Sequence, residues 1–280
     1  MGASAWQGFC QSGWAKRGVL VAGLLLSGCT AVHTTGEGAI GLHRRQLMSA
    51  LVSEAELEQS ARVAYAEVLQ KSQAAHALNT DPAMTLRVRN IAGRLISQVG
   101  VFRQDALHWQ WQVNVIRAHE MNAWCMPGGK IAVYSGIIQR LNLTDDEIAA
   151  IMGHEMAHAL REHAREQASE QATAGLLINA GAVGFGLGGS GVDLGRLAYQ
   201  TTFGLRHSRV HETEADRIGV ELAARAGYDP RAAITLWMKM ASLGGGREQP
   251  EFLSTHPSAQ TRIRDLQSYS ARVLPLYQGR

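Results

Sequence analysis

The most constraining feature of the sequence is the stretch IMGHEMAHALREH at residues 151–163. Its residues favour a helix, and His154 and His158 are four positions apart, so their imidazoles project from one helical face. Glu155 lies beside that face, where the carboxylate of a His-Glu-x-x-His zinc site acts as a general base. The spacing therefore predicts two metal ligands and a base around a common point. The alternative is an amphipathic helix whose surface histidines have this spacing by chance.

His163 is the third histidine of the stretch, but its position does not match a third ligand of known motifs. In the pattern His-Glu-x-x-His-x-x-Gly-x-x-His, the last histidine follows the second by six residues, beyond a glycine that ends the helix. Here the offset is five, and Arg161 stands at the glycine position. Because ALREHAREQ consists largely of good helix formers, we expect an uninterrupted helix with His163 as a solvated side chain.

A third metal ligand is predicted in a second helix. A catalytic zinc has three protein ligands and one open position. The segment VHETEADRIGVELAARAGYDP indicates a helix that ends before Gly227, with Glu212 and Asp216 on one face. Glu212 can then bind the metal, while Asp216 accepts the outer N–H of a ligating imidazole. Glu214 is a rival ligand, although it points about 200° away from Glu212. Without the histidine motif, Glu212 and Asp216 would indicate a charged, solvated helix face.

Together these motifs resemble the gluzincin metallopeptidases, in particular the family that contains HtpX and the CaaX prenyl proteases. The resemblance runs from about residue 80 to 270 and includes NAWCMPGGKIAVYSGI and STHPSAQTRIRDL. It is greatest to the bacterial periplasmic lipoprotein branch, represented by LoiP and BepA. It implies that His154, His158 and Glu212 bind zinc and that Glu155 is the catalytic base. The sequence departs from BepA in stopping at residue 280, before any C-terminal helical repeats, and from HtpX in lacking its membrane spans.

The resemblance also implies roles for residues outside the two helices. Thermolysin-like enzymes carry a similar Asn-Ala-aromatic run on the edge strand beside the zinc. Asn122 and Ala123 are therefore expected to pair with the main chain of an extended substrate. For His256 three roles stay open: an extra ligand that holds the enzyme latent, a hydrogen-bond donor to the developing oxyanion, or a structural residue at a helix N-terminus.

Residues 1–28 have the features of a secretory signal. Lys16 and Arg17 precede the apolar run GVLVAGLLLSGC, which is too short to span a bilayer stably. Leu-Ser-Gly-Cys at residues 26–29 resembles a bacterial lipobox, in which the signal is cut before the cysteine and Cys29 is acylated. Because Thr30 and not Asp follows the cysteine, lipoprotein sorting rules indicate the periplasmic face of the outer membrane. A retained anchor helix is the alternative.

Charge and cysteine content argue against a nucleic-acid-binding protein and against a fold held by disulfides. The chain has 27 basic and 24 acidic residues, and loss of Lys16 and Arg17 leaves 25 and 24 in a mature chain of 252 residues. No basic patch for nucleic acid is expected. Cys10 leaves with the signal and Cys29 is acylated, so Cys125 has no intramolecular disulfide partner. We expect Cys125 to be a buried packing residue at a strand end and not a nucleophile.

The rest of the chain predicts one domain over residues 44–280, after an acylated polar tether over residues 29–43. Charged and apolar residues have helical spacing over residues 44–73. LHWQWQVNVI and KIAVYSG predict strands of a small sheet, with a turn at residues 127–129.

Two sequence signals mark helix starts. Asp81 and Pro82 are typical of an N-cap and a first-turn proline, for a helix to about Val99. Thr144 and Glu147 match a capping box at the start of the metal helix.

An apolar, glycine-rich segment at residues 175–195 separates the two ligand helices. Its lack of charge is compatible with a membrane span, but glycines cluster at its end and disfavour a long helix. We expect a short buried helix that leads into a flexible loop, and this loop is a candidate lid over the site.

These features predict a zincin-type α+β fold, predominantly helical with a small β-sheet beside the metal helix, that holds one Zn²⁺ per chain. The expected function is a zinc metalloendopeptidase of the bacterial cell envelope that hydrolyses unfolded or misassembled envelope proteins. Expected partners are such polypeptides and the membrane, through the lipid anchor; outer-membrane assembly factors and other proteases are candidates. The alternative is a non-proteolytic holdase or outer-membrane assembly factor with a structural zinc.

Overall fold

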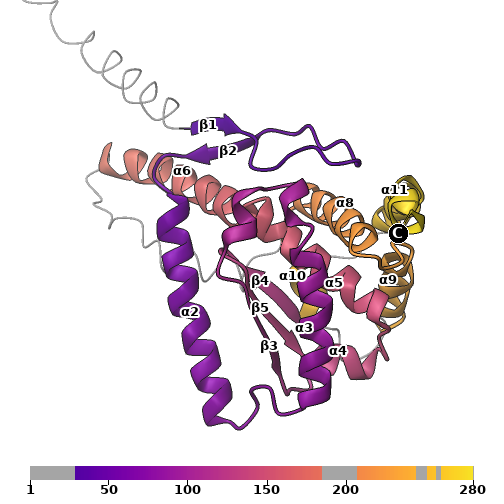
Figure 1. Ribbon diagram of the computed structural model, residues 1–280. Coiled ribbons are helices and arrows are strands. Elements are labelled where there is room, and N and C mark those ends of the chain that lie inside the picture. Colours follow the sequence, from indigo (N-terminus) through magenta and orange to yellow (C-terminus); the bar gives the residue numbers. More distant parts are fainter. Residues whose placement is uncertain (1–28, 185–206, 244–250, 257–259, 280) are drawn as a thin grey trace, which may run out of the picture.

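Helices form most of the molecule, which is a computed structural model that describes residues 29–184, 207–243, 251–256 and 260–279 (Figure 1). Its helices are α2 (Glu54–Ala74), α3 (Pro82–Ile96), α4 (Ser135–Arg140), α5 (Asp145–Leu160), α6 (His163–Gly184), α8 (Arg209–Arg225), α9 (Ala232–Leu243), α10 (Glu251–Thr255) and α11 (Gln260–Gln278), with short 3-10 turns η1 (Val99–Val101) and η2 (Asp105–His108). Within these ranges, no helix combines the length and apolar character that crossing a membrane requires. The predicted α+β class is confirmed.

A three-stranded sheet lies beside the central helix α5. β3 (Gln112–Ile116) pairs in parallel with β5 (Lys130–Tyr134), and β4 (Ala123–Met126) pairs antiparallel with β5. The sheet order is β3-β5-β4, so β4 is an edge strand. The predicted turn joins β4 to β5, and Gly128 and Gly129 have φ angles of 74° and 76° there, which glycine adopts without steric cost.

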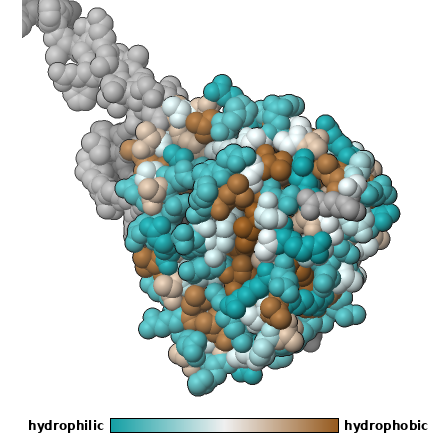
Figure 2. Space-filling view, viewed as in Figure 1, coloured by the Kyte–Doolittle hydropathy of each residue, from teal (hydrophilic) through white to brown (hydrophobic). Residues whose placement is uncertain are grey.

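The two faces of the sheet pack against different helices. Ala123 and Cys125 of β4 belong to the main core with α5, whereas Trp124 and Met126 pack toward α2. On the α2 side, Tyr65 meets Trp124 edge to face, with ring centroids 5.7 Å apart. The side chains of β4 alternate between the two faces, as strand geometry requires. In Figure 2 the surface that carries α2 and α3 is largely hydrophilic, with an apolar strip between the two helices.

The helices α5 and α8 cross in close contact because each has a glycine at the crossing point. A Cβ atom on Gly153 would lie 2.8 Å from the carbonyl oxygen of Gly219, and a Cβ on Gly219 would lie 2.8 Å from the amide nitrogen of His154. Larger side chains would push the helices apart. The glycine pair therefore brings the predicted ligands of the two helices within reach of one another.

The N-terminal region differs from the prediction in two ways. The expected helix over residues 44–73 starts only at Glu54, because Gln46–Ser49 forms strand β2, which pairs antiparallel with β1 (Cys29–Val32). The segment that follows β1 is not a free tether, because Ile40 and Leu42 are buried in the main core. Residues 29–43 therefore pack against the domain, while the predicted signal over residues 1–28 lies outside the described residues.

The uninterrupted helix expected through His163 is also wrong. α5 ends at Leu160, Glu162 has a φ of 53°, and α6 starts a new direction at His163. The side chain of Arg161, only 1% exposed, bonds to Glu214 and to the carbonyl oxygen of Arg44. These tertiary contacts override the local helix propensity.

The other predicted helix boundaries agree well with the structure. Asp81 caps α3 and Pro82 opens it, although α3 ends at Ile96, a turn before Val99. Thr144 and Glu147 form the predicted capping box of α5. α8 ends before Gly227, and α6 extends to Gly184, which is longer than the short helix we expected; residues 185–206, with the predicted lid, lie outside the described part of the chain.

Candidate metal centre and active site

Four buried side chains, three of them from α5 and α8, converge at the centre of the domain. α5 contributes His154 and His158, α8 contributes Glu212, and His256 follows the end of α10. One ligand atom from each lies within 4.8 Å of the other three. His154 Nε2 is 3.1 Å from His158 Nε2, and His256 Nδ1 is 2.9 Å from Glu212 Oε1. The predicted ligands therefore lie together, and His256 lies among them.

The donor set fits a metal ion. The Nδ1 atom of His154 lies 3.0 Å from Asp216 Oδ1, and a carboxylate accepts hydrogen bonds only, so the imidazole proton lies on Nδ1. Nε2 of His154 is then a bare lone pair that faces the Nε2 of His158. Imidazole nitrogens and a carboxylate oxygen are the ligands of zinc sites, and Asp216 occupies the orienting position predicted for it.

Arg262 of α11 fixes the two carboxylates of α8 and was not predicted from the sequence. Its guanidinium donates to Asp216 Oδ2 and Oδ1 at 2.7 Å each and to Glu212 Oε2 at 2.5 Å, and it lies over the ring of Trp237. Burial alone would raise the pKa of Glu212, but His256 and Arg262 hold that pKa well below its usual range. Glu212 is therefore ionised, and Arg262 holds both Glu212 and Asp216 in place.

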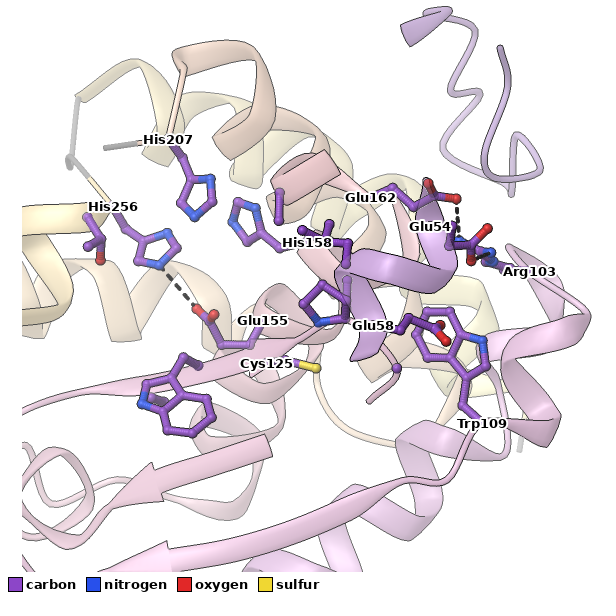
Figure 3. Close-up of a pocket in the computed structure, with 18 of the residues that line it drawn as sticks. Glu54, Glu58, Arg103, Trp109, Cys125, Glu155, His158, Glu162, His207 and His256 are labelled. Carbon is purple, nitrogen blue, oxygen red and sulfur yellow. Dashed lines mark hydrogen bonds and ion pairs between the residues drawn. The ribbon is translucent and has the colours of Figure 1, made fainter. Parts of the chain in front are cut away.

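Glu155 points into a pocket beside the four-residue cluster (Figure 3). It is 4% exposed, and its Oε1 accepts no hydrogen bond from the described residues, although the Nε2 of His256 lies 3.5 Å away. Burial raises the pKa of Glu155 to about 8; the electrostatic interaction with His154 opposes this rise, and the nearby Glu212 adds to it. A carboxylate with a pKa near neutrality is suited to exchanging a proton with a reacting group.

The pocket runs from the cluster along the edge strand to the first half of α2 (Figure 3). Its far end is lined by residues of α2, of the turn at residues 127–129 and of the region around η2, including Leu57, Glu58, Arg103, Trp109 and Gly128. One wall of the pocket is β4, and the lining combines charged, aromatic and aliphatic side chains.

Asn122 and Ala123 both line the pocket, but only one of them turns its main chain toward it. The carbonyl of Asn122 accepts from the N–H of Tyr134 on β5. Neighbouring residues of a strand point their main-chain groups in opposite directions, so those of Ala123 face the open edge. The N–H of Ala123 is bonded to the side-chain oxygen of Asn122 at 2.9 Å, which a substrate would have to replace.

One further prediction for this region needs correction. His163 is fully buried and not solvated, because it bonds to His158 and Glu214. Glu214, the rival of Glu212, lies outside the four-residue cluster and bonds to Arg44, Arg161 and His163. Cys125 is buried as predicted, and burial raises the pKa of its thiol well above its usual value.

His207 is a pocket residue that the sequence analysis did not single out. Its ring centroid is 4.1 Å from that of His158 and 5.0 Å from that of His256. Its main-chain N–H donates to the carbonyl of Thr255. It stands shortly before α8, and no spacing rule links it to the other histidines.

Comparison with known proteins agrees with this geometry. The model of peptidase family M48 matches residues 82–270. The chain is 33% identical to mitochondrial metalloendopeptidase OMA1 of Schizosaccharomyces pombe over 186 residues, which are 66% of this chain and 52% of that protein. It is 40% identical to OMA1 of Danio rerio over 59% of this chain and 37% of that protein.

A bacterial relative is the beta-barrel assembly-enhancing protease of Escherichia coli, with 25% identity over 71% of this chain and 41% of that protein. The chain thus spans about half or less of these relatives' lengths. The matched region includes α5, α8 and most of α11 and so carries all four residues of the cluster. The chain belongs to peptidase family M48.

Proposed function

We propose that the chain is a zinc-dependent metalloendopeptidase with one Zn²⁺ per chain. The observation that carries the proposal is the position of Glu155, a buried carboxylate whose Oε1 accepts no hydrogen bond from the described residues, beside the converging nitrogens of His154 and His158. A purely structural metal site would need no such base. These two histidines and Glu212 would hold the zinc, which when bound lowers the pKa of a coordinated water and polarises a carbonyl group.

The protein's own groups would then perform the proton transfers. Glu155 accepts the proton of the attacking water and passes it to the leaving amine. Asp216 fixes the tautomer of His154, and Arg262 holds the carboxylates of Asp216 and Glu212 in position by hydrogen bonds.

Substrates of this enzyme would be unfolded polypeptides. The outward main-chain groups of Ala123 lie on an edge strand, where an extended peptide can add as a further strand. Such pairing reads main chain more than side chains, so it selects segments that are free to extend. A folded protein offers few of these segments.

The cellular setting we propose is the bacterial envelope, in the lipoprotein branch that includes LoiP and BepA. Support comes from the Leu-Ser-Gly-Cys motif at residues 26–29 and from the similarity to the Escherichia coli assembly-enhancing protease. Acylated Cys29 would tether the enzyme to the periplasmic face of the outer membrane, and its substrates would be misassembled envelope proteins. Outer-membrane assembly factors or other proteases are the partners that this setting suggests.

The proposal is tested by removal and return of the metal. Purified full-length protein should cleave casein, lose this activity on dialysis against 1,10-phenanthroline, and regain it with one equivalent of Zn²⁺. Elemental analysis should find one zinc per chain in the active fraction. Cleavage that proceeds at the same rate in the zinc-free protein would overturn the assignment.

A further inference from the structure

The outer nitrogen of His158 is bonded to another histidine and not to a carboxylate. His163 Nδ1 lies 2.9 Å from His158 Nδ1, and both rings are buried. In an uninterrupted helix, residues five apart point about 140° away from each other. The reversal at Glu162, with its φ of 53°, turns His163 back toward His158.

The next contact in this chain of hydrogen bonds determines where the protons lie. His163 Nε2 is 3.1 Å from Glu214 Oε2, and this carboxylate is ionised because two guanidinium groups, of Arg44 and Arg161, donate to it. The carboxylate can only accept, so His163 carries its proton on Nε2 and has a lone pair on Nδ1. His158 must then donate from Nδ1. Its Nε2 is left as a lone pair directed at the cluster, the tautomer that a metal ligand needs.

Arg44 connects this arrangement to the N-terminal segment. Its Nε and Nη2 donate to the two oxygens of Glu214 at 2.7 and 2.8 Å, and its Nη1 and Nη2 donate to those of Glu166 at 2.6 and 2.8 Å. Paired contacts of this kind between guanidinium and carboxylate fix both position and angle. Arg44 lies between β1 and β2, in the segment that follows Cys29.

We propose that His163 is a positioning residue for His158, that Glu214 sets the tautomer of His163, and that Arg44 holds the N-terminal segment against Glu214. The hydrogen-bonded series His158, His163 and Glu214 is called the relay below. The inference rests on the proposed role of His158 as a zinc ligand. His154 has a carboxylate, Asp216, as its direct acceptor, whereas His158 reaches its carboxylate through an imidazole. Zinc affinity therefore depends on residues well outside the ligand set, including one near the N-terminus of the described chain.

His211 provides a matched control. It is buried like His163, its ring stacks on that of His163 with centroids 4.3 Å apart, and its Nε2 bonds to Glu166 at 3.1 Å. Among the described residues, no hydrogen bond, ion pair or ring contact joins His211 to His158. Replacing His211 with leucine removes an imidazole from the same polar region without removing the acceptor of His158.

The experiment measures the zinc dissociation constant of the full-length protein by competition with a chromophoric chelator. His163→Leu should weaken zinc binding about 10- to 100-fold, the usual effect of losing the partner of a metal-bound histidine. His211→Leu should change it less than about threefold, within the scatter of changes that leave the ligand's partner in place. His163→Asn should recover part of the loss, because its amide oxygen can accept from His158.

Arg44→Lys tests whether the N-terminal segment acts on zinc binding through Glu214. It keeps a long, charged side chain but loses the paired hydrogen bonds. It should weaken zinc binding by less than His163→Leu does but by more than His211→Leu does. Thermal unfolding of each zinc-free variant confirms that it is folded. If His163→Leu does not fold, His163→Asn and Arg44→Lys decide the question by the same comparison with His211→Leu.

Equal zinc affinity in the His163 and His211 variants would overturn the relay. Equal affinity of Arg44→Lys and the unmodified protein would overturn the N-terminal link. If the unmodified protein itself binds no zinc, the proposed function fails, and the relay fails with it. The first two results leave the proposed function in place, so the failures are distinguishable.

Discussion

His154 Nε2 and His158 Nε2 lie 3.1 Å apart with both lone pairs turned toward each other, because each ring donates its proton to an acceptor on its outer side. Glu212 adds a carboxylate 3.5 to 3.6 Å from these nitrogens. Without a cation, this arrangement places electron-rich atoms against one another. A metal ion removes that repulsion, so metal binding and folding should stabilise each other.

The first prediction concerns the carboxylate ligand. Glu212→Gln should strongly lower zinc content, because an amide is a much poorer ligand than a carboxylate. Glu221→Gln is the control, since Glu221 is equally buried on α8 but bonds to the amides of Ala39 and Ile40. Elemental analysis of both purified variants is the measurement. Equal zinc content would remove Glu212 from the ligand set.

The ligand pattern could be predicted from the sequence because a helix fixes side-chain direction. The four-residue spacings of His154 with His158 and of Glu212 with Asp216 determine which side chains share a face. The capping box and the glycine turn are equally local. The regular geometry of a helix or turn therefore explains why these residues could be placed from the sequence.

The residues that the sequence analysis missed depend on contacts between distant segments. Arg262 reaches the site from α11, and Arg44 from the N-terminal segment. The break before His163 follows from the burial of Arg161 by partners far away in the chain. Strand β2 forms because residues 29–32 pair with it, although its own sequence has helical spacing. None of these partners is visible in a local pattern.

The second prediction concerns His256, which belongs to the four-residue cluster. This position favours the latch among the roles considered, because a fourth protein ligand excludes the water that the reaction needs. His256→Ala should therefore raise the rate of casein cleavage. A lower rate would instead assign His256 as an oxyanion donor, and an unchanged rate would make it structural.

The third prediction concerns the attachment of the protein to a membrane. Multiple acyl chains on Cys29 would anchor the protein stably, whereas one chain is marginal. Cys29→Ser should yield soluble or unprocessed protein in cell fractionation. Continued incorporation of labelled fatty acid into this variant would contradict acylation at Cys29.

The fourth prediction concerns pH and the start of α5. Burial alone would raise the pKa of Glu147, but hydrogen bonds from Lys239, Thr144 and Thr235 lower it below its usual value of 4.5. A carboxylate whose pKa is lower in the folded state than in the unfolded state stabilises the protein at pH values above the unfolded-state pKa. This contribution is lost as the pH falls through the folded-state pKa. Glu147→Gln should cost about 1 to 3 kcal/mol at pH 7 and progressively less below about pH 4.5.

Chemical denaturation across this pH range checks the prediction for Glu147. The exposed Glu67 is a suitable control, because Glu67→Gln should change the free energy of unfolding by less than about 0.5 kcal/mol at any pH. A loss in Glu147→Gln that stays constant down to pH 3 would show that its carboxylate is not responsible.

Glu155→Gln tests whether Glu155 is the catalytic base. Glutamine keeps the size of the side chain but cannot accept a proton from water, so the fold, zinc content and substrate binding should persist. Casein cleavage should fall by about 10²- to 10⁴-fold, the usual contribution of a general base. Cleavage of casein by this variant at the unmodified rate would contradict the role of Glu155 as the base. If it lost cleavage yet fully restored the envelope of a strain that lacks the protein, the holdase would replace the peptidase as the physiological function.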